Sequence, residues 1–199
     1  MQFTYRTAIQ LLLPALLMPL CAGCLPATQL ETAWKDPSVG PLSFKKLAIV
    51  VLNSTAGERR AQEDQIVSMI KKTQAVPSYT FIPDNILTKR DEVKSRIIQG
   101  GFDGAAIIRL VDSSKQTTYV PGTTSYWNDV YAYGPYRYDP GYYVTDTIVR
   151  AELSLYAVPS GKLLWVGSSV TSNPANAKDL ATQMANAAAA ELRKQGLLE

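Results

Sequence analysis

The sequence feature that most restricts the fold is an uninterrupted apolar run from Leu47 to Leu52. The run has the length of a strand, and its lack of polar alternation is typical of a strand covered on both faces, as in a parallel sheet. Such a strand needs a layer on each side of the sheet, and helices usually supply it. The run therefore predicts a central strand in an α/β fold.

A helix is expected directly after this strand. Thr55 and Glu58 have the spacing of a capping box, in which each residue satisfies a backbone group of the other. Residues at helical spacing then mark one side of a helix that reaches about Lys72. The five residues on that side are Gln62, Ile66, Met69, Ile70 and Thr73.

The next segments repeat the order of strand and helix. Val76–Ile82 is predicted as a second strand, and the capping spacing of Thr88–Asp91 predicts a second helix that Gly100-Gly101 can end. Asp103–Asp112 is predicted as a third strand. Together these elements give a β-α-β-α-β half with right-handed crossovers.

The pattern changes in the last third of the chain. Thr147–Tyr156 alternates between two sets of residues, which predicts a half-exposed antiparallel strand. Pro159–Lys162 is a turn, and Leu163–Val170 returns as the second arm of a hairpin with Trp165 inside it.

A final helix is expected after the hairpin, with Asn173 as its cap, Pro174 in its first position and Gly196 at its end. Its narrow stripe of mostly small residues comprises Ala177, Leu180, Ala181, Met184, Ala187 and Ala188. The predicted fold class is therefore α/β: a β-α-β-α-β half, an antiparallel hairpin and a C-terminal helix, in one mixed sheet with helices packed on it.

The first 23 residues have the parts of an export signal, with Arg6 before an apolar core at Leu11–Leu20. That core is about half the length of a membrane-spanning helix. The string Leu20-Cys21-Ala22-Gly23-Cys24 resembles the lipobox of bacterial lipoproteins. The resemblance implies cleavage before Cys24, lipid on that cysteine, and sorting to the outer membrane because Leu25 follows. The alternative is an ordinary cleaved signal that leaves an unmodified cysteine.

The remaining chain is expected to be a lipidated tether at 24–43 and a single domain at 44–199. Removing 23 residues from 199 leaves 176, which suits one domain. The tether carries three prolines and is expected to dock Trp34 on the domain surface. Subtracting Arg6 leaves 19 basic and 17 acidic residues, a balance that does not indicate nucleic-acid binding.

The sequence contains no histidine, which removes the usual zinc sites and the Ser-His-Asp and Cys-His nucleophile systems. Paired carboxylates would remain for a hydrolase, but the sequence indicates no particular pair. We therefore predict a protein that is not an enzyme and has neither a cofactor nor a metal site. Cys24 is the only cysteine after cleavage, and once lipidated it cannot form a disulfide.

The most unusual segment is 118–143, which holds eight of the eleven tyrosines, counted from Tyr119 to Tyr143. Such a surface suits contact with a protein or stacking on sugar rings. The alternative is a long hairpin loop whose aromatic rings pack on one another and on the domain. The candidate binding residues are Tyr126, Trp127, Tyr131, Tyr133, Tyr136 and Tyr138.

Two sets of charged residues are further candidate sites. Charges at helical spacing usually form solvated ion pairs, and a small recognition patch is the alternative; this set comprises Arg59, Arg60, Glu63 and Asp64. Asp103, Asp112 and Asp146 lie at predicted strand ends, where we expect turn caps in preference to ligand groups.

Five strings together resemble a group of uncharacterised bacterial lipoproteins: Trp34–Pro37, Arg60–Asp64, Val76–Tyr79, Gly101–Gly104 and Ser160–Trp165. The order of elements also resembles the small α/β domains of the TolB amino-terminal kind, seen in the envelope lipoproteins CsgG and LpoB. That resemblance implies action through assembly and protein contacts, although a fold does not fix a function.

The sequence thus predicts a non-enzymatic interaction or assembly module, anchored to the outer membrane through Cys24 and facing the periplasm. The expected partner is another envelope protein or a second copy of the chain. The alternative is binding of peptidoglycan or another glycan through the Tyr-rich loop.

The anchor is testable through its two signal-proximal cysteines. We expect Cys24→Ala to abolish acyl labelling and to leave the precursor uncleaved, because the thiol is the acylated group. Cys21→Ala should label and mature normally. Acyl labelling that survives in the Cys24 variant would place the lipid on another residue.

Overall fold

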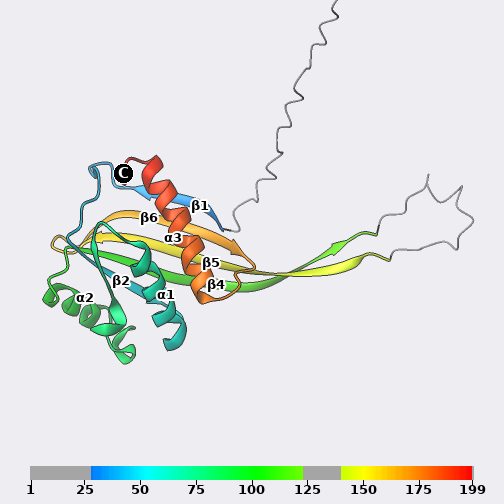
Figure 1. Cartoon of the computed structure of the whole chain (residues 1–199), viewed down its shortest axis with the longest axis horizontal. Helices are drawn as coiled ribbons and strands as arrows, with labels where there is room; N and C mark the ends of the chain where they lie inside the picture. The colour runs from blue at the N-terminus through cyan, green and yellow to red at the C-terminus, as the bar shows by residue number, and fades with distance from the viewer. Residues whose placement is uncertain (1–27, 123–139, 199) are drawn as a thin grey trace, which may run out of the picture.

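The computed structural model describes residues 28–122 and 140–198, and within them the chain forms a mixed sheet with helices on both faces (Figure 1). The predicted fold class is confirmed. The expected signal peptide, Cys24 and the six candidate aromatic residues of the loop lie outside the described residues.

The sheet has six strands in the order β1-β6-β5-β4-β2-β3. β2 is parallel to both of its neighbours, β3 and β4, and every other adjacent pair is antiparallel. The strands are β1 (Thr28–Lys35), β2 (Lys46–Leu52), β3 (Gln74–Pro77), β4 (Gly104–Val120), β5 (Tyr142–Ala157) and β6 (Lys162–Ser172).

Three α-helices cover the sheet: α1 (Ala56–Met69) and α3 (Ala177–Lys194) on one face, and α2 (Arg90–Gln99) on the other (Figure 1). The crossover from β2 to β3 and the crossover from β3 to β4 run in opposite directions along the sheet. Two crossovers of the same hand that run in opposite directions lie on opposite faces. The topology therefore places α1 and α2 on different sides.

β2 is buried on both faces, as its apolar run predicts. Ile49 and Val51 pack towards α1 and α3, whereas Ala48 and Val50 pack towards α2, and none of the four side chains is more than 1% exposed. The strand thus joins the two hydrophobic clusters of the domain.

The helix ends follow the sequence in part. The capping box of α1 is present, because the Thr55 hydroxyl accepts the N–H of Glu58 and the Glu58 carboxylate accepts the N–H of Thr55. The predicted cap of the second helix is wrong: α2 begins after Lys89, which makes no side-chain capping bond. The predicted cap of the final helix, Asn173, is also wrong: α3 begins at Ala177, and the side chain of Asn176 caps it by accepting the N–H of Asp179.

The predicted second strand, Val76–Ile82, is mostly wrong. β3 ends at Pro77, and two 3-10 turns follow at Ser78–Thr80 and Asp84–Ile86. Proline has no N–H for a ladder, and the N–H of Ile82 donates to the Ser78 carbonyl at 2.7 Å, which closes a turn in place of a strand.

The predicted tether is also corrected, because its residues 28–35 form β1, which pairs antiparallel with β6. The Thr28 and Thr171 hydroxyls lie 2.7 Å apart in the pair that starts this ladder. A register shift between Leu30 and Thr32 interrupts the strand, so the sequence carries no regular alternation. Trp34 lies opposite Val166 and is 46% exposed.

A second contact fixes the chain after β1. The Asp36 carboxylate binds the Lys162 ammonium at 3.0 Å at the start of β6. The hydroxyl of Ser38, together with Lys162, lowers the pKa of Asp36 from 3.8 to about 2.

The packing of β1 is testable at Gly167. A Cβ at this position would meet the ring of Trp165 and the Leu30 side chain of β1. We expect Gly167→Ala to lower the free energy of unfolding by about 1 to 3 kcal/mol, the usual cost of overpacking a core. Urea denaturation of the full chain measures the change.

The matched control is Gly57→Ala in α1, where a Cβ meets nothing within 4 Å. That change should leave the stability unchanged or raise it by up to about 1 kcal/mol, since alanine favours a helix. Equal stability of the two variants would contradict the close packing of Trp165 and Leu30 around Gly167.

Candidate functional site

β4 and β5 continue together well beyond the rest of the sheet (Figure 1). The pairing of β2 with β4 ends at Arg109, and the pairing of β6 with β5 ends at Ile148. β4 and β5 stay paired out to Val120 and Tyr142. We call residues 113–120 and 142–147 the ribbon; it projects from the body as a two-stranded arm.

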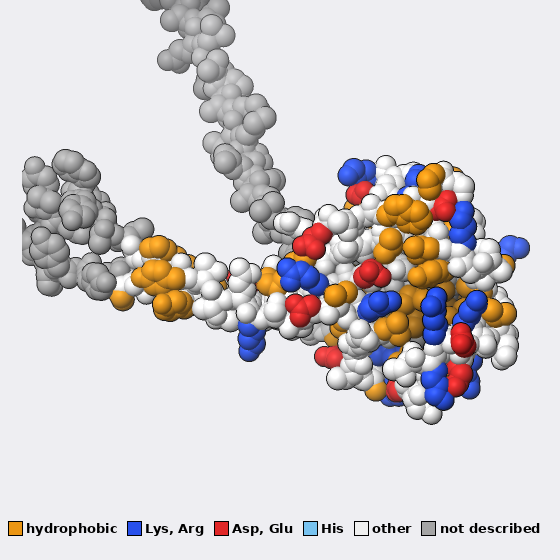
Figure 2. Space-filling model, turned by 180° about the vertical axis from the view of Figure 1, so that it is seen from behind, with side chains coloured by type: hydrophobic (Ala, Val, Ile, Leu, Met, Phe, Trp, Pro, Cys, Tyr) orange, Lys and Arg blue, Asp and Glu red, His pale blue; other side chains and the backbone are white. Residues whose placement is uncertain are grey.

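The predicted Tyr-rich insertion, 118–143, is partly wrong at its two ends. Thr118–Val120 belong to β4 and Tyr142-Tyr143 belong to β5, so these residues lie in strands and not in a loop. Tyr119, Tyr142 and Tyr143 are 48%, 61% and 73% exposed, and the Tyr119 and Tyr143 rings pack with centroids 5.1 Å apart. Aromatic side chains therefore gather at the outer end of the ribbon (Figure 2).

The hydrogen bonds of Thr147 show which backbone N–H and C=O groups of the ribbon point outward. Its N–H donates to Asn173 Oδ1 at 2.8 Å, and its carbonyl accepts the N–H of Asn173 at 2.8 Å. Both groups therefore point away from β4. Lys115 is directly opposite Thr147, so its backbone groups point away from β5 in the same way.

The two outer edges of the ribbon differ in length. The register is continuous from Asp112 to Val120, so outward-facing residues alternate with inward-facing ones. On β5 the outward-facing residues are Tyr143, Thr145 and Thr147, of which Asn173 already binds Thr147. On β4 they are Ser113, Lys115, Thr117 and Tyr119. Within residues 28–122 and 140–198, no strand pairs with this edge of β4 beyond Arg109.

The ends of the main sheet are protected against pairing with other strands. β1 has a register shift at Glu31, and charged side chains at Glu31 and Lys35. β3 has only four residues and ends in Pro77. Bulges, charges, proline and short length are the usual means of blunting an edge strand. Between Ser113 and Val120 the free edge of β4 has no bulge and no proline, and Lys115 is its one charged residue.

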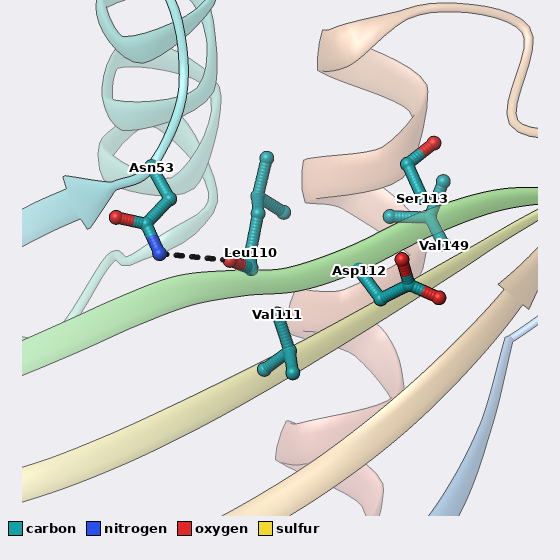
Figure 3. Close-up of a pocket in the computed structure, with 6 residues that line it drawn as sticks. All are labelled: Asn53, Leu110, Val111, Asp112, Ser113 and Val149. Atoms are coloured by element: carbon teal, nitrogen blue, oxygen red, sulfur yellow. Dashed lines mark hydrogen bonds between the residues drawn. The ribbon is translucent and has the colours of Figure 1, made fainter.

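A hollow of about 300 Å³ lies where β2 ends and the free edge of β4 begins (Figure 3). Asn53, which has a φ of 61°, follows β2 and donates from Nδ2 to the Leu110 carbonyl at 3.1 Å. A register shift between Leu110 and Asp112 turns Val111 out to 60% exposure. The hollow thus marks the inner end of the free edge.

A larger groove, about 950 Å³, lies on the sheet face that α2 covers only in part, the face seen in Figure 2. Apolar residues such as Leu52 and Ile107 line it together with Arg109 and Glu152. Its other carboxylate, Asp84, is bound by Arg59. The described residues contain no group of three metal-ligating side chains.

The prediction of solvated ion pairs in the first helix is wrong for Arg59 and Glu63, whose side chains are 1% and 0% exposed. Arg59 Nε lies 3.0 Å from Glu63 Oε1, and its other nitrogens donate to Ser78 Oγ and Asp84 Oδ1. Glu63 also accepts the N–H groups of Val51 and Tyr79. The pair therefore fastens α1 to β2 and to the turn after β3.

The other two charges of that set are exposed, in agreement with the prediction. Arg60 is 59% exposed and its Nη2 lies 3.8 Å from Asp84 Oδ2. Asp64 Oδ1 accepts the Tyr79 hydroxyl at 2.8 Å, and this bond raises the pKa of Tyr79.

Asp103 is a turn cap, as predicted, since its carboxylate accepts the N–H groups of Lys45 and Lys46. Burial raises the pKa of Asp103, but these two donors, the N–H of Asp103 itself and the charge of Lys45 together lower it, so the net pKa is below its usual value. Asp112 and Asp146 lie inside strands because β4 and β5 are longer than expected. They bind Arg150 at 3.7 Å and the Asn173 amide at 2.7 Å, respectively.

No protein-family model matches the chain, and no curated protein sequence matches it. Solved structures similar to it include the PelC dodecamer from Paraburkholderia phytofirmans, with 10% identity and a TM-score of 0.44 over 86% of this chain and 99% of that one. Lipoprotein GNA1162 from Neisseria meningitidis has 12% identity and a TM-score of 0.41, over 75% of this chain and 98% of that one.

A minor lipoprotein from Acinetobacter baumannii has 12% identity and a TM-score of 0.29, over 75% of this chain and 96% of that one. The resemblance to CsgG and LpoB stays a prediction. None of the helices in the described ranges is long and apolar enough to cross a membrane. The function therefore has to be inferred from the chain's own residues.

The buried pair of α1 is testable against its exposed neighbour. We expect Arg59→Met to lower the free energy of unfolding by roughly 3 to 5 kcal/mol, because the buried Glu63 carboxylate would lose its only cationic partner among the described residues. Arg60→Met should change it by less than about 0.5 kcal/mol, as an exposed side chain does. Equal effects of the two substitutions in urea denaturation would contradict the structural role of Arg59.

Proposed function

We propose that the chain is a lipid-anchored protein of the bacterial cell envelope that serves as an interaction or assembly module and catalyses no reaction. The ribbon is its contact arm. The observation that carries this proposal is a long two-stranded projection with a free backbone edge on β4, in a sheet whose own ends are blunted.

The physical chemistry of the ribbon supports a partner. Two strands alone in water are marginally stable, and three or more are usually needed for independent stability. β4 residues 113–119 are all exposed, so the ribbon buries little of its own surface. An added strand would satisfy the backbone groups of the free edge, which is how β-augmentation produces affinity.

The outer end of the ribbon adds side-chain contact area. Tyr119, Tyr142 and Tyr143 present apolar rings with hydrogen-bonding tips and few rotamers, which suits a protein interface. The same rings could stack on sugars, so the glycan alternative predicts a different captured molecule and is distinguished in the experiment below.

The anchor supports an envelope location. Lipid on Cys24 would hold the protein to the outer membrane on its periplasmic side, as the Leu25 position implies. Since β1 begins at Thr28, three residues (25–27), or four Cα-to-Cα steps, separate the anchor from the sheet. Four such steps span at most about 14 Å. Lipid on Cys24 would therefore hold the body closer to the membrane surface than a tether to residue 43 would.

The contact role is testable in intact cells with photo-reactive residues in the full-length protein. Substitution at Thr117, Tyr142 or Tyr143 should give crosslinked protein, whereas substitution at the exposed Asn186 of α3 should give little. If the ribbon positions give only the uncrosslinked chain, the ribbon is not a contact arm. Capture of glycan strands in place of protein would favour the sugar-binding alternative.

A further inference from the structure

We propose that the ribbon's partner is a second copy of this chain, and that two copies pair antiparallel through the free edge of β4 with the two-fold axis at Gln116. This inference rests on the proposed function of the ribbon as a contact arm. It specifies the partner, the strand, the direction and the register, which the proposed function leaves open.

The edge of β4 is the better candidate of the two ribbon edges. It offers the outward-facing backbone groups of Ser113, Lys115, Thr117 and Tyr119, which are free within the described residues. The corresponding edge of β5 is shorter, because Asn173 already binds both backbone groups of Thr147. An interface built on one edge used by both copies is isologous, the arrangement of the common two-fold dimers.

The sequence of this edge is complementary to itself when it is centred on Gln116. Ser114 then lies opposite Thr118 of the second copy, a pairing of hydroxyl side chains that stabilises adjacent strands. The one charged side chain of the central stretch, Lys115, lies opposite Thr117. Like charges therefore do not face each other across the interface.

Neighbouring registers fit less well. Centring on Lys115 would place two lysines directly opposite each other, which destabilises a strand pair. Centring on Thr117 would place Pro121 opposite Ser113, at an outward-facing position that requires an N–H. Gln116 is also the midpoint of the continuous stretch from Asp112 to Val120.

The free edge of β4 is long enough for this register. With Gln116 on the axis, Pro121 of the second copy lies at the level of Val111, beyond the pairing of β4 with β2, which ends at Arg109. Val111 is 60% exposed and lines the hollow at the inner end of the free edge (Figure 3). The result is a four-stranded sheet, β5-β4-β4-β5, which exceeds the three strands that usually make a sheet independently stable.

The lipid anchor would favour this pairing without any further contact. Copies held to one membrane surface share a thin layer, and confinement raises the effective concentration of each for the other. A weak edge-to-edge contact can therefore form between anchored copies even where free copies in dilute solution would separate.

The test compares two prolines placed across the ribbon from each other in the full-length lipidated protein, purified in detergent after crosslinking in cells. Thr117 and Thr145 are paired, and both N–H groups point away from the other ribbon strand. Neither substitution removes a backbone hydrogen bond within the ribbon, and both remove the same side-chain contact, that of the Thr117 and Thr145 hydroxyls at 3.1 Å. Only Thr117→Pro also removes a donor from the edge of β4. We expect loss of the dimer with Thr117→Pro and an unchanged dimer with Thr145→Pro.

The outcomes separate the hypotheses. Loss of the dimer with both prolines would overturn self-pairing through β4 alone, since it indicates that β4 of one copy binds β5 of the next. A dimer that survives both prolines would overturn edge pairing. A ribbon that crosslinks only to a different protein would overturn this inference and leave the proposed function intact, whereas no crosslink at all would overturn both.

A cysteine substitution tests the register directly and does not require that the ribbon tolerate a proline. The backbone groups of Gln116 point towards β5, so the two Gln116 residues would form a non-hydrogen-bonded pair across the interface. In such a pair the Cα atoms are about 4.5 Å apart, within disulfide range. Gln116→Cys should therefore give a disulfide-linked dimer on oxidation, and Thr118→Cys, opposite Ser114, should not. Efficient crosslinking of the Thr118 variant in place of the Gln116 variant would contradict the proposed axis.

Discussion

The constraint on which the rest of the structure depends is the burial of β2 on both faces. Ile49 and Val50 are 0% exposed and point in opposite directions, so helices have to cover both sides of the sheet at this strand. The order of strands meets this demand, because the two crossovers beside β2 run in opposite directions and place α1 and α2 on different faces. The hairpin of β5 and β6 then extends the sheet on one side only.

The buried pair of Arg59 and Glu63 shows how the polar groups are accommodated under this constraint. Glu63 reaches from α1 to the backbone of β2, and Arg59 reaches to the turn after β3. A buried ion pair is weak evidence for added stability, but one with its hydrogen bonds satisfied fixes the position of the elements it joins. Side chains therefore hold the short β3 and the two 3-10 turns in place. In a longer strand, backbone hydrogen bonds to the neighbouring strand would do this.

The ribbon contrasts with this compact body. Sheet ends that would attract other strands are blunted in β1 and β3, while the β4 edge of the ribbon has neither bulge nor proline. An exposed flat edge is a liability for a protein that acts alone, and it is a binding surface for a protein that assembles. The described structure thus separates a protected folding unit from an exposed strand edge, which is why we propose the ribbon, and not the groove beside α2, as the contact arm.

Elements whose signals are local can be predicted from the order of residues alone. The apolar run of β2, the capping box at Thr55, the hairpin turn before Lys162 and the stripe that buries Leu180 and Met184 each depend on residues a few positions apart. Backbone geometry links such neighbours directly, so their spacing is sufficient to predict them.

The strand state of β1, the burial of Arg59 and the length of the ribbon depend on contacts between residues far apart in the sequence. Thr28 pairs with Thr171, and Lys115 pairs with Thr147, so the strand state of each depends on a partner far away in the sequence. The bulge in β1 and the polar sequence of the ribbon leave no apolar alternation to read. A charged residue at helical spacing, such as Arg59, likewise looks the same in sequence whether its partners are water or a buried carboxylate, because burial is a property of the whole fold.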